Sequence, residues 1–505
     1  MSTAVALSLF GFSAPASAQQ EGCLFGDQGK NDVLYETLPN GDQITYVSGP
    51  HFVCADGIDI WADSAVAYSP QGLSHMIGSV RYVDETRVLR ADEARYFSNQ
   101  GRLQAEGHMS IRDEGDSSSI ENGDLVYLRQ TDFRAEETMT VVTGSDEVRP
   151  RAILAPPAPD SSTDESSPSE PYTVIGDRIF LRGASYFTAA GNVEIVRDSL
   201  FAFADSVEYD QSFGDLLLEG RARVEGEDYD LTARTITLGS PASAANEVHA
   251  MREARLTGDN LLLTSAQIFV YLRDNELERL VATPMIRGDG AVLADSSELS
   301  RPEVTVDHYV LTADSLEVSA PNQSVERVFA AGSARSVSNA GDSLSVAALP
   351  EVAQSDWLEG DTVIVIFVPP SPDAGHGEGD DLQVDRIVAR VGARSLYRLA
   401  PSDTTAQAGI DPPAVHYVVG DEITIQMADG KIEGMHVVGQ TRGMHLEPLT
   451  ERAPPSDSAG IEVDTTSAND TIMAVFQTPG RDVPESHDPL IARDTPRKEE
   501  HWIRL

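Results

Sequence analysis

The sequence predicts an all-β protein made of repetitive antiparallel hairpins, and three observations support this prediction. Apolar and polar residues alternate with a period of two, as in residues 103–112, and no helix would produce that pattern. A two-strand repeat recurs almost to the C-terminus. No segment combines sustained helical spacing of apolar residues with helix caps, so we expect helix to be scarce.

The clearest copy of the repeat is ADEARYFSNQGRLQAEGHMSI, residues 91–111. Its first strand places Ala94 and Tyr96 on one face, and Asn, Gln and Gly at residues 99–101 supply a turn. Its second strand, from residue 103 onward, again alternates apolar and polar positions. The repeat is therefore a hairpin with one apolar face.

Two features mark each copy of the repeat. The first strand begins with a small residue and an aspartate, and the second strand often has a glycine four positions after an apolar residue. Gly78 and Gly107 are 29 residues apart, as are Gly191 and Gly220, which indicates repeats that bury their faces on one another. The copies begin at Ala62, Ala91, Gly123, Gly176, Ala204, Ala313, Gly360 and Gly420, with degenerate copies at Ala233 and Ala266.

The aspartate recurs too regularly to be catalytic. We expect it to accept hydrogen bonds in turns, because the short carboxylate of Asp reaches nearby backbone donors. The examples are Asp63, Asp92, Asp205 and Asp314.

Interruptions of the alternation suggest how the chain is divided. Residues 149–171, rich in Pro, Ser and acidic residues, are expected to be a disordered linker. One β module is expected at 24–148 and a longer one at 172–449, in which residues 369–381 and 401–413 are long loops. Alternation fades after Pro448, so residues 450–505 are expected to be a disordered tail.

The N-terminus predicts export. Residues 1–18 contain an apolar core followed by Ala16-Ser17-Ala18, which fits a signal peptide and its cleavage site, although no Lys or Arg lies near Met1. The alternative is an apolar N-terminal tail. Cys23 and Cys54 are the only cysteines, and an oxidising compartment would let them form a disulfide. After residue 18, no apolar stretch is long enough for a membrane-spanning helix.

The net charge of −44, from 81 acidic and 37 basic residues, argues against a nucleic-acid partner, since phosphate binding needs concentrated positive charge. The acidity is explained most simply by a solvated outer face. The alternatives are association with divalent cations or life at high salt.

The apolar face of each strand is rich in Gly and Ala, and two interpretations remain open. Small residues leave room between sheets for another molecule, such as a lipid acyl chain, or they simply allow tight packing of the sheets. Sequence alone does not distinguish an apolar channel from a filled core.

Two stretches resemble a known family. The first is residues 91–127, with ADEARYF, GRLQAEGHMSI and GDSSSIENGDLVY, and the second is residues 173–238, with FTAAGNVEI, ADSVEYD and LLLEGRARVEGEDYDLTART. Both resemble the OstA-like domain of the lipopolysaccharide-transport proteins LptA and LptD, which is related to the periplasmic part of LptC. Bridge proteins of that family are much shorter than this chain, which would be a version with several modules.

The resemblance implies elongated, folded-over β-jellyroll modules that are open along one side. It also implies a periplasmic protein, associated with the outer membrane, that shields acyl chains of lipopolysaccharide or a similar amphiphile in an apolar groove. Other β-jellyroll transport proteins would join it by edge-strand addition. No cofactor and no bond-breaking chemistry are implied.

The candidate lipid-contacting residues are inward apolar positions of the best copies, and core packing is the alternative role for each. They are Tyr68, Val80, Tyr96, Leu103, Met109, Ile111, Tyr127, Val193, Ile195, Val207, Tyr209 and Val224.

Catalytic signals are weak, so we expect no enzymatic activity. The sequence contains no nucleophile elbow, phosphate-binding loop or His-Glu-x-x-His pair. The cluster GHGEGDD, with His376, Glu378, Asp380 and Asp381, could hold a cation but is more simply a solvated loop. Two other classes remain: a non-catalytic structural envelope scaffold with a solid interior, and a β-helical carbohydrate-active enzyme, which would need shorter rungs and paired carboxylates.

Overall fold

The chain is all-β, as predicted. The computed structural model describes residues 23–25, 32–54, 57–115, 117–154, 171–183, 185–197, 200–210, 215–226, 228–239, 246–273, 276–285, 301–321, 324–338, 345–347, 349–368, 382–399, 412–428, 431–447 and 500–504. Within these ranges the regular elements are antiparallel β-strands and short 3-10 turns. None of the described residues forms a helix long and apolar enough to span a lipid bilayer.

The chain forms two compact units. Unit 1 comprises residues 1–198 and 206–213, and unit 2 comprises residues 199–205 and 214–505. Strand β18 (Leu200–Asp210) contributes residues to both. Within the predicted linker at 149–171, Arg151–Leu154 form a strand that pairs with Tyr172–Ile175, and both of these strands belong to unit 1. Residues 155–170 of the predicted linker lie outside the described residues.

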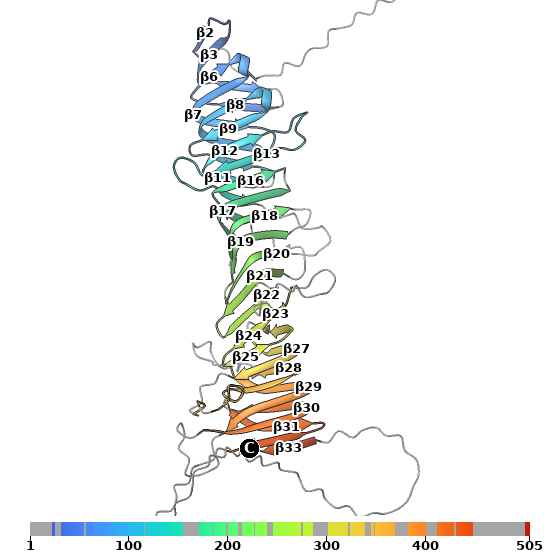
Figure 1. Ribbon diagram of the computed structural model, residues 1–505. Helices are drawn as coiled ribbons and strands as arrows, with labels where there is room; N and C mark the ends of the chain where they lie inside the picture. The colour runs from blue at the N-terminus through green and yellow to red at the C-terminus, as the bar shows by residue number, and fades with distance from the viewer. Residues whose placement is uncertain are drawn as a thin grey trace, which may run out of the picture. The chain divides into compact units, whose positions relative to one another are not determined.

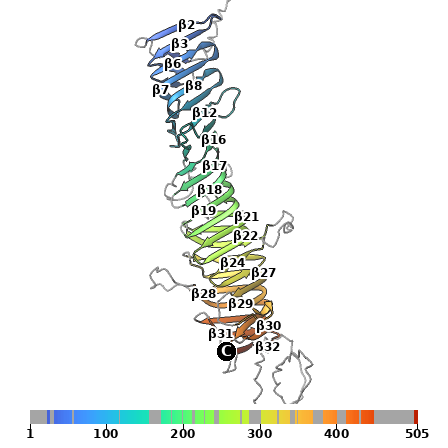
Figure 2. The same cartoon turned by 60° about the vertical axis from the view of Figure 1, so that its left-hand side comes forward.

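The remaining elements of unit 1 follow one another through the blue and green part of Figure 1, which Figure 2 shows from another side. They are β1 (Cys23–Phe25), β2 (Val33–Thr37), β3 (Gln43–Ser48), β4 (His51–Cys54), β5 (Ile58–Trp61), β6 (Ser64–Tyr68), η1 (Ser69–Gln71), β7 (Leu73–Val83), β8 (Arg87–Phe97), η2 (Ser98–Gln100), β9 (Arg102–Glu106), β10 (Ser110–Asp113), β11 (Ser119–Glu121), β12 (Asp124–Leu128), β13 (Thr138–Val142), β14 (Arg151–Leu154), β15 (Tyr172–Ile175), β16 (Arg178–Arg182) and β17 (Tyr186–Arg197).

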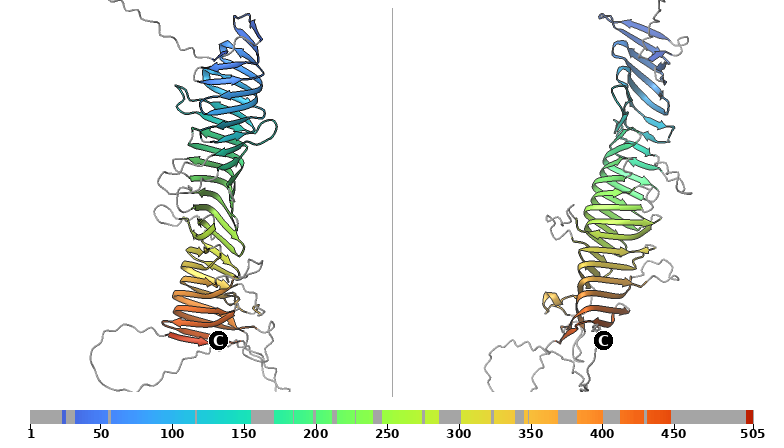
Figure 3. Two further views of the ribbon diagram at one scale, coloured as in Figure 1. Left: turned by 180° about the vertical axis from the view of Figure 1, so that it is seen from behind. Right: turned by 90° about the vertical axis from the view of Figure 1, so that its right-hand side faces the viewer.

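Unit 2 contains the elements drawn from green to red in Figure 3. They are β19 (Asp215–Glu225), β20 (Tyr229–Leu238), β21 (Asn246–Gly258), β22 (Leu261–Arg273), β23 (Glu276–Thr283), β24 (Glu303–Val306), β25 (Tyr309–Thr312), β26 (Ser315–Ser319), β27 (Arg327–Ser338), η5 (Glu351–Ala353), β28 (Asp356–Phe367), β29 (Val384–Leu399), β30 (Ala414–Ala428), β31 (Lys431–Val438), β32 (Arg442–Leu446) and β33 (Glu500–Arg504).

Within unit 1 the strands form two layers, because long strands bend near their middle and their two halves pair with different neighbours. Residues 73–77 of β7 pair with β6, whereas residues 81–83 pair with β5. The first layer runs β2, β3, β6, β7, β8, β9, β12, β13, β16 and β17. The second layer runs β1, β4, β5, β7, β8, β10, β11, β14, β15 and β17.

Unit 2 repeats the bend. Residues 327–331 of β27 pair with β26, and residues 335–338 pair with β25. The ladder shifts register between Ala331 and Ala334. At the far end, β33 pairs with β31 through the register Met435 to Ile503. The other residues of the predicted tail, 450–499 and 505, lie outside the described part of the chain.

Many of these bends are corners built from the two recurring features of the sequence, whereas β21 and β29 bend at Arg252–Glu253 and Val391–Gly392 without them. Gly107 and His108 have φ values of 76° and 43°, and the backbone N–H of Asp92 donates to the Gly107 carbonyl at 2.8 Å. A Cβ on Gly107 would lie 2.7 Å from Oδ2 of Asp92, so a side chain there would collide with the carboxylate. The same contact joins Asp63 to Gly78, Asp177 to Gly191, Asp205 to Gly220, Asp314 to Gly332 and Asp421 to Gly439.

The residue after the corner glycine often hydrogen-bonds to the same aspartate. Ser79 Oγ donates to Asp63 at 3.0 Å, His108 Nδ1 lies 2.7 Å from Asp92 Oδ2, and Arg221 Nε donates to Asp205 at 2.9 Å. A serine, a histidine and an arginine thus make the same hydrogen bond to the corner aspartate in three different repeats. The recurring aspartates therefore lie at strand corners rather than in hairpin turns, and the carboxylates of Asp63, Asp92 and Asp205 bind the side chain that follows the corner glycine.

We predict that Gly107→Ala lowers the free energy of unfolding by more than the positive φ at residue 107 alone would cause. Gly57→Ala is the control, because Gly57 has φ 72° and nothing lies within 4 Å of the added methyl group. The control should lose about 1–2 kcal/mol for an L-residue in the left-handed region, and Gly107→Ala about 1–3 kcal/mol more for overpacking. Chemical denaturation measures both, and equal losses would show that the Asp92 contact is unimportant.

Candidate functional site

Most of the twelve candidate residues are buried. Ten of them are exposed by 4% or less: Val80, Tyr96, Leu103, Met109, Ile111, Tyr127, Val193, Ile195, Val207 and Val224. Tyr68 and Tyr209 are half-buried. Side chains this inaccessible to water pack against protein atoms on every side, so hydrocarbon can reach them only where the layers separate.

The sheet register gathers several of these residues into rows across unit 1. In the first layer, Tyr96 pairs with Leu103, which pairs with Tyr127. The second layer holds a buried apolar row that includes Ile111 and Ile195. Its members, each paired with the next, are Tyr82, Leu89, Ile111, Ile120, Ala152, Val174 and Ile195.

A second row in the first layer crosses the whole of unit 1, and we call it the apolar track. Each member pairs with the next: Val33, Val47, Ala65, Met76, Ala94, Ala105, Leu125, Val141, Ile179 and Ala189. All of them except Val33 are buried. The track is continuous because alternation places one apolar residue of every strand on the inner face at the same level.

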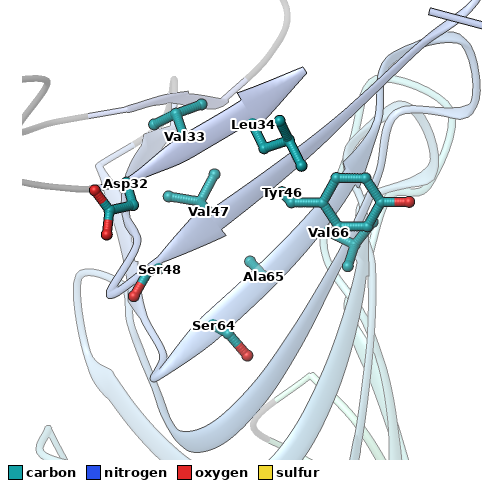
Figure 4. Close-up of a pocket in the computed structure, with 9 residues that line it drawn as sticks. All are labelled: Asp32, Val33, Leu34, Tyr46, Val47, Ser48, Ser64, Ala65 and Val66. Carbon is teal, nitrogen blue, oxygen red and sulfur yellow. The ribbon is translucent and has the colours of Figure 1, made fainter. Parts of the chain in front are cut away.

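The apolar track ends in an open groove at the edge of unit 1, shown in Figure 4. The groove has a volume of about 430 Å³ and lies across three neighbouring strands, β2, β3 and β6. Its lining includes Val33, Val47 and Ala65, the first three members of the track. Asp32, Ser48 and Ser64 form a polar row along one side of it.

Strand β2 borders this groove and is an exposed edge. It pairs with β3 on one side, and every one of its residues is exposed. Leu34 and Tyr35 are 66% and 58% exposed, which is unusual for large apolar side chains on a sheet edge. In the second layer, Cys54 on β4 is disulfide-bonded, and the backbone of β1 sets Cys23 opposite Cys54.

Neither the groove nor the edge is visible in the repeat pattern. The first complete repeat begins at Ala62, after β2 and β3, so the pattern gives no reason to single out Val33, Leu34 or Val47. The available signal is the alternation in QITYVS, residues 43–48. The predicted signal peptide and the cluster at 376–381 lie outside the described residues. Among the residues that the structure does describe, no group of three or more His, Cys, Asp or Glu side chains could hold a metal ion.

A polar cluster, which we call the Arg87 clasp, joins the two layers of unit 1 on the side away from the corners. Arg87 is the first residue of β8, in the half of that strand that belongs to the second layer. Tyr127 lies near the end of β12 and Glu137 directly precedes β13, and both of these strands belong to the first layer. Arg87 Nη1 donates to the Tyr127 hydroxyl at 2.8 Å and to Glu137 Oε2 at 2.5 Å, while its Nη2 donates to Glu137 Oε1. Arg87 Nε donates to Asp113 at 3.1 Å, and the Tyr127 hydroxyl donates to Glu137 at 2.7 Å.

The charges of the clasp stabilise one another. Burial disfavours the ionised carboxylate of Glu137, but hydrogen bonds from Arg87 and Tyr127 outweigh burial and lower its pKa. Burial also disfavours the Arg87 cation, and the hydrogen bond to Glu137 more than offsets this, so the pKa of Arg87 is raised. The clasp is therefore a charged, two-pronged Arg–carboxylate pair, which is the stronger class of protein hydrogen bond.

No protein family model matches the chain, and no curated protein is similar to it.

We predict that Glu137→Gln lowers the free energy of unfolding by about 1–3 kcal/mol at neutral pH, because hydrogen bonds to charged partners are lost. The pKa of Glu137 is lowered in the folded chain, so its stabilising contribution is present above about pH 4.3 and is lost as the pH falls through the lower folded value. The difference between the two proteins, measured by urea denaturation from pH 7 downward, should therefore shrink in acid. A difference independent of pH would contradict this assignment.

Proposed function

We propose that this protein is a non-catalytic bridge of the bacterial envelope that shields the hydrocarbon chains of an amphiphile between its two β-layers. The apolar track carries this proposal, because it runs across unit 1 and emerges in an open groove at β2. A hydrocarbon chain gains about 0.8 kcal/mol for each buried methylene. An interior of nearly uniform apolar character offers similar affinity at successive positions, which suits transfer along it.

The exposed edge at β2 supports a partner at the same end. Strand β2 pairs with β3 on one edge, and no described strand pairs with its other edge, so it can accept a strand from another β-protein, which would extend the first layer. The track would then continue into the partner. We propose β-jellyroll transport proteins as these partners, because residues 91–127 and 173–238 resemble the OstA-like domain.

The same resemblance leads us to propose lipopolysaccharide or a similar amphiphile as the cargo and the periplasm as the compartment. The disulfide bond of Cys54 supports an oxidising compartment. The strong negative charge of the chain requires the anionic head group of such a lipid to remain in solvent or to be bridged by divalent ions.

A structural envelope scaffold is the second candidate, and a specific observation favours it. Ten of the twelve candidate residues are almost fully buried, as in a filled core. In a scaffold the layers stay closed, whereas in a carrier they separate to admit a hydrocarbon chain. The groove at β2 is the feature that a scaffold does not require.

We predict that the purified full chain retains amphiphile, visible as added mass in native mass spectrometry. A photo-crosslinking residue at Val33, in the groove, and one at Leu103, in the interior, should both capture lipid. The control is a crosslinker at exposed Phe133, away from the groove and 72% exposed, which should capture little. Capture at Val33 without capture at Leu103 would limit lipid contact to the edge, and capture at neither position would favour the scaffold.

We also predict that Leu34→Lys together with Tyr35→Lys weakens association through β2. Lysine on an edge strand opposes pairing with another chain. The matched control is Phe133→Lys, a similarly exposed apolar position in a loop. Analytical ultracentrifugation should show less self-association or partner binding for the edge variant alone, and an unchanged profile would remove β2 as the docking edge.

A further inference from the structure

The two sides of the folded sheet in unit 1 are held together differently. On one side the chain itself passes from layer to layer at corners such as that of Asp92 and Gly107. On the other side, which we call the mouth, hairpin turns end each layer separately. Residues 84–86 turn in the second layer, and residues 129–137 connect β12 to β13 in the first. Across the mouth the layers are joined through side chains.

The Arg87 clasp is a joint of this second kind. Its guanidinium comes from the second layer and reaches Tyr127 and Glu137 in the first. The side chains of Arg87 and Glu137 are 17% and 26% exposed, so the clasp lies at the boundary between solvent and the interior. Directly inside it, Leu103 pairs with Tyr127 and is fully buried.

We propose that the mouth of unit 1 at the Arg87 clasp is a lateral opening through which a hydrocarbon tail reaches the interior, and that the clasp is its latch. This inference rests on the proposed function and adds the place at which cargo enters from the side. A tail that enters there meets Tyr127, Leu103 and Tyr96, which form one row across three strands. A hydrocarbon tail is the class of ligand that fits, because that row presents rings and an aliphatic side chain.

The chemistry of the latch suits reversible opening. Its bonds are non-covalent, and the polar groups that they join lie next to solvent, where water can replace each lost partner. At the corners the covalent chain itself passes from one layer to the other, so the layers cannot separate there in the same way. Separation of the layers should therefore begin at the mouth and leave the corners closed.

The first test measures opening without any lipid. Leu103→Cys places a thiol behind the clasp, and Ile179→Cys places one on β16 next to the corner at Asp177; both native side chains are fully buried. No described cysteine of the chain is free to compete. Glu137→Gln should raise the rate of maleimide reaction at the thiol behind the clasp about tenfold, as expected for loss of one charged hydrogen-bond pair. It should leave the rate at the thiol next to the corner nearly unchanged.

The matched control is Glu106→Gln. It removes a carboxylate that pairs with Arg95 at 3.1 Å within the first layer, and so it does not join the layers. Tyr127→Phe is a milder variant that keeps the Arg87–Glu137 ion pair and should accelerate the reaction behind the clasp less than Glu137→Gln. Equal acceleration of the two thiols, or equal effects of Glu106→Gln and Glu137→Gln, would overturn the latch.

The second test adds a fluorescent fatty acyl probe to the delipidated full chain. Glu137→Gln should take up the probe faster than the wild-type chain, and Glu106→Gln should behave like wild type. If the thiol introduced by Leu103→Cys in the first test reacts faster in Glu137→Gln but probe uptake by Glu137→Gln is unchanged, the mouth is not where the probe enters. That result would overturn the lateral opening and leave the groove at β2 as the route of entry. Failure of every variant to bind the probe would overturn the proposed function itself.

Discussion

The contact between an aspartate and a glycine is the constraint that shapes six of the described strand corners, and the two-layer fold of unit 1 depends on such corners. The aspartate carboxylate occupies the space in which a side chain at the glycine would lie, and the backbone of the two residues is hydrogen-bonded across the corner. Two successive residues with positive φ turn each strand there, as at Gly78 and Ser79. Where this turn occurs it directs the apolar face of the strand inward, while β21 and β29 bend at Arg252–Glu253 and Val391–Gly392 without an aspartate–glycine contact.

Much of the interior could be predicted from the sequence, because alternation alone assigns a face to each residue. It places Leu103, Ile111 and Val193 inward, and all three are buried. The aspartate and the glycine each recur visibly in the sequence, yet their contact is not visible there. Asp92 lies on β8 and Gly107 directly follows β9, 15 residues later, so their meeting depends on the register of β8 and β9, which the hairpin turn fixes and which sequence spacing does not reveal.

The Arg87 clasp and the groove could not be predicted for related reasons. Arg87 and Glu137 are 50 residues apart, and each resembles the many other charged residues of the outer faces until the layers are folded together. The groove at β2 exists because the first layer ends there, and no local pattern distinguishes Val33, at the end of the apolar track, from its buried counterpart Val47. The repeats of such a protein can be recognised in its sequence. Where the stack of repeats ends, and where its two layers can separate, depends on how the repeats pack together, which the sequence pattern does not show.

The preference for arginine over lysine suits an acidic chain. Only three of the 37 basic residues are lysines. A guanidinium can pair with two carboxylates and also lie flat on an aromatic ring, which a lysine ammonium does less well. Arg335 combines an ion pair with a ring contact, since it pairs with Glu359 and lies 4.6 Å from the ring centre of Trp357. Arg335 thereby offsets the charge of a carboxylate on the adjacent strand, β28, and such pairs reduce repulsion among the carboxylates of neighbouring strands.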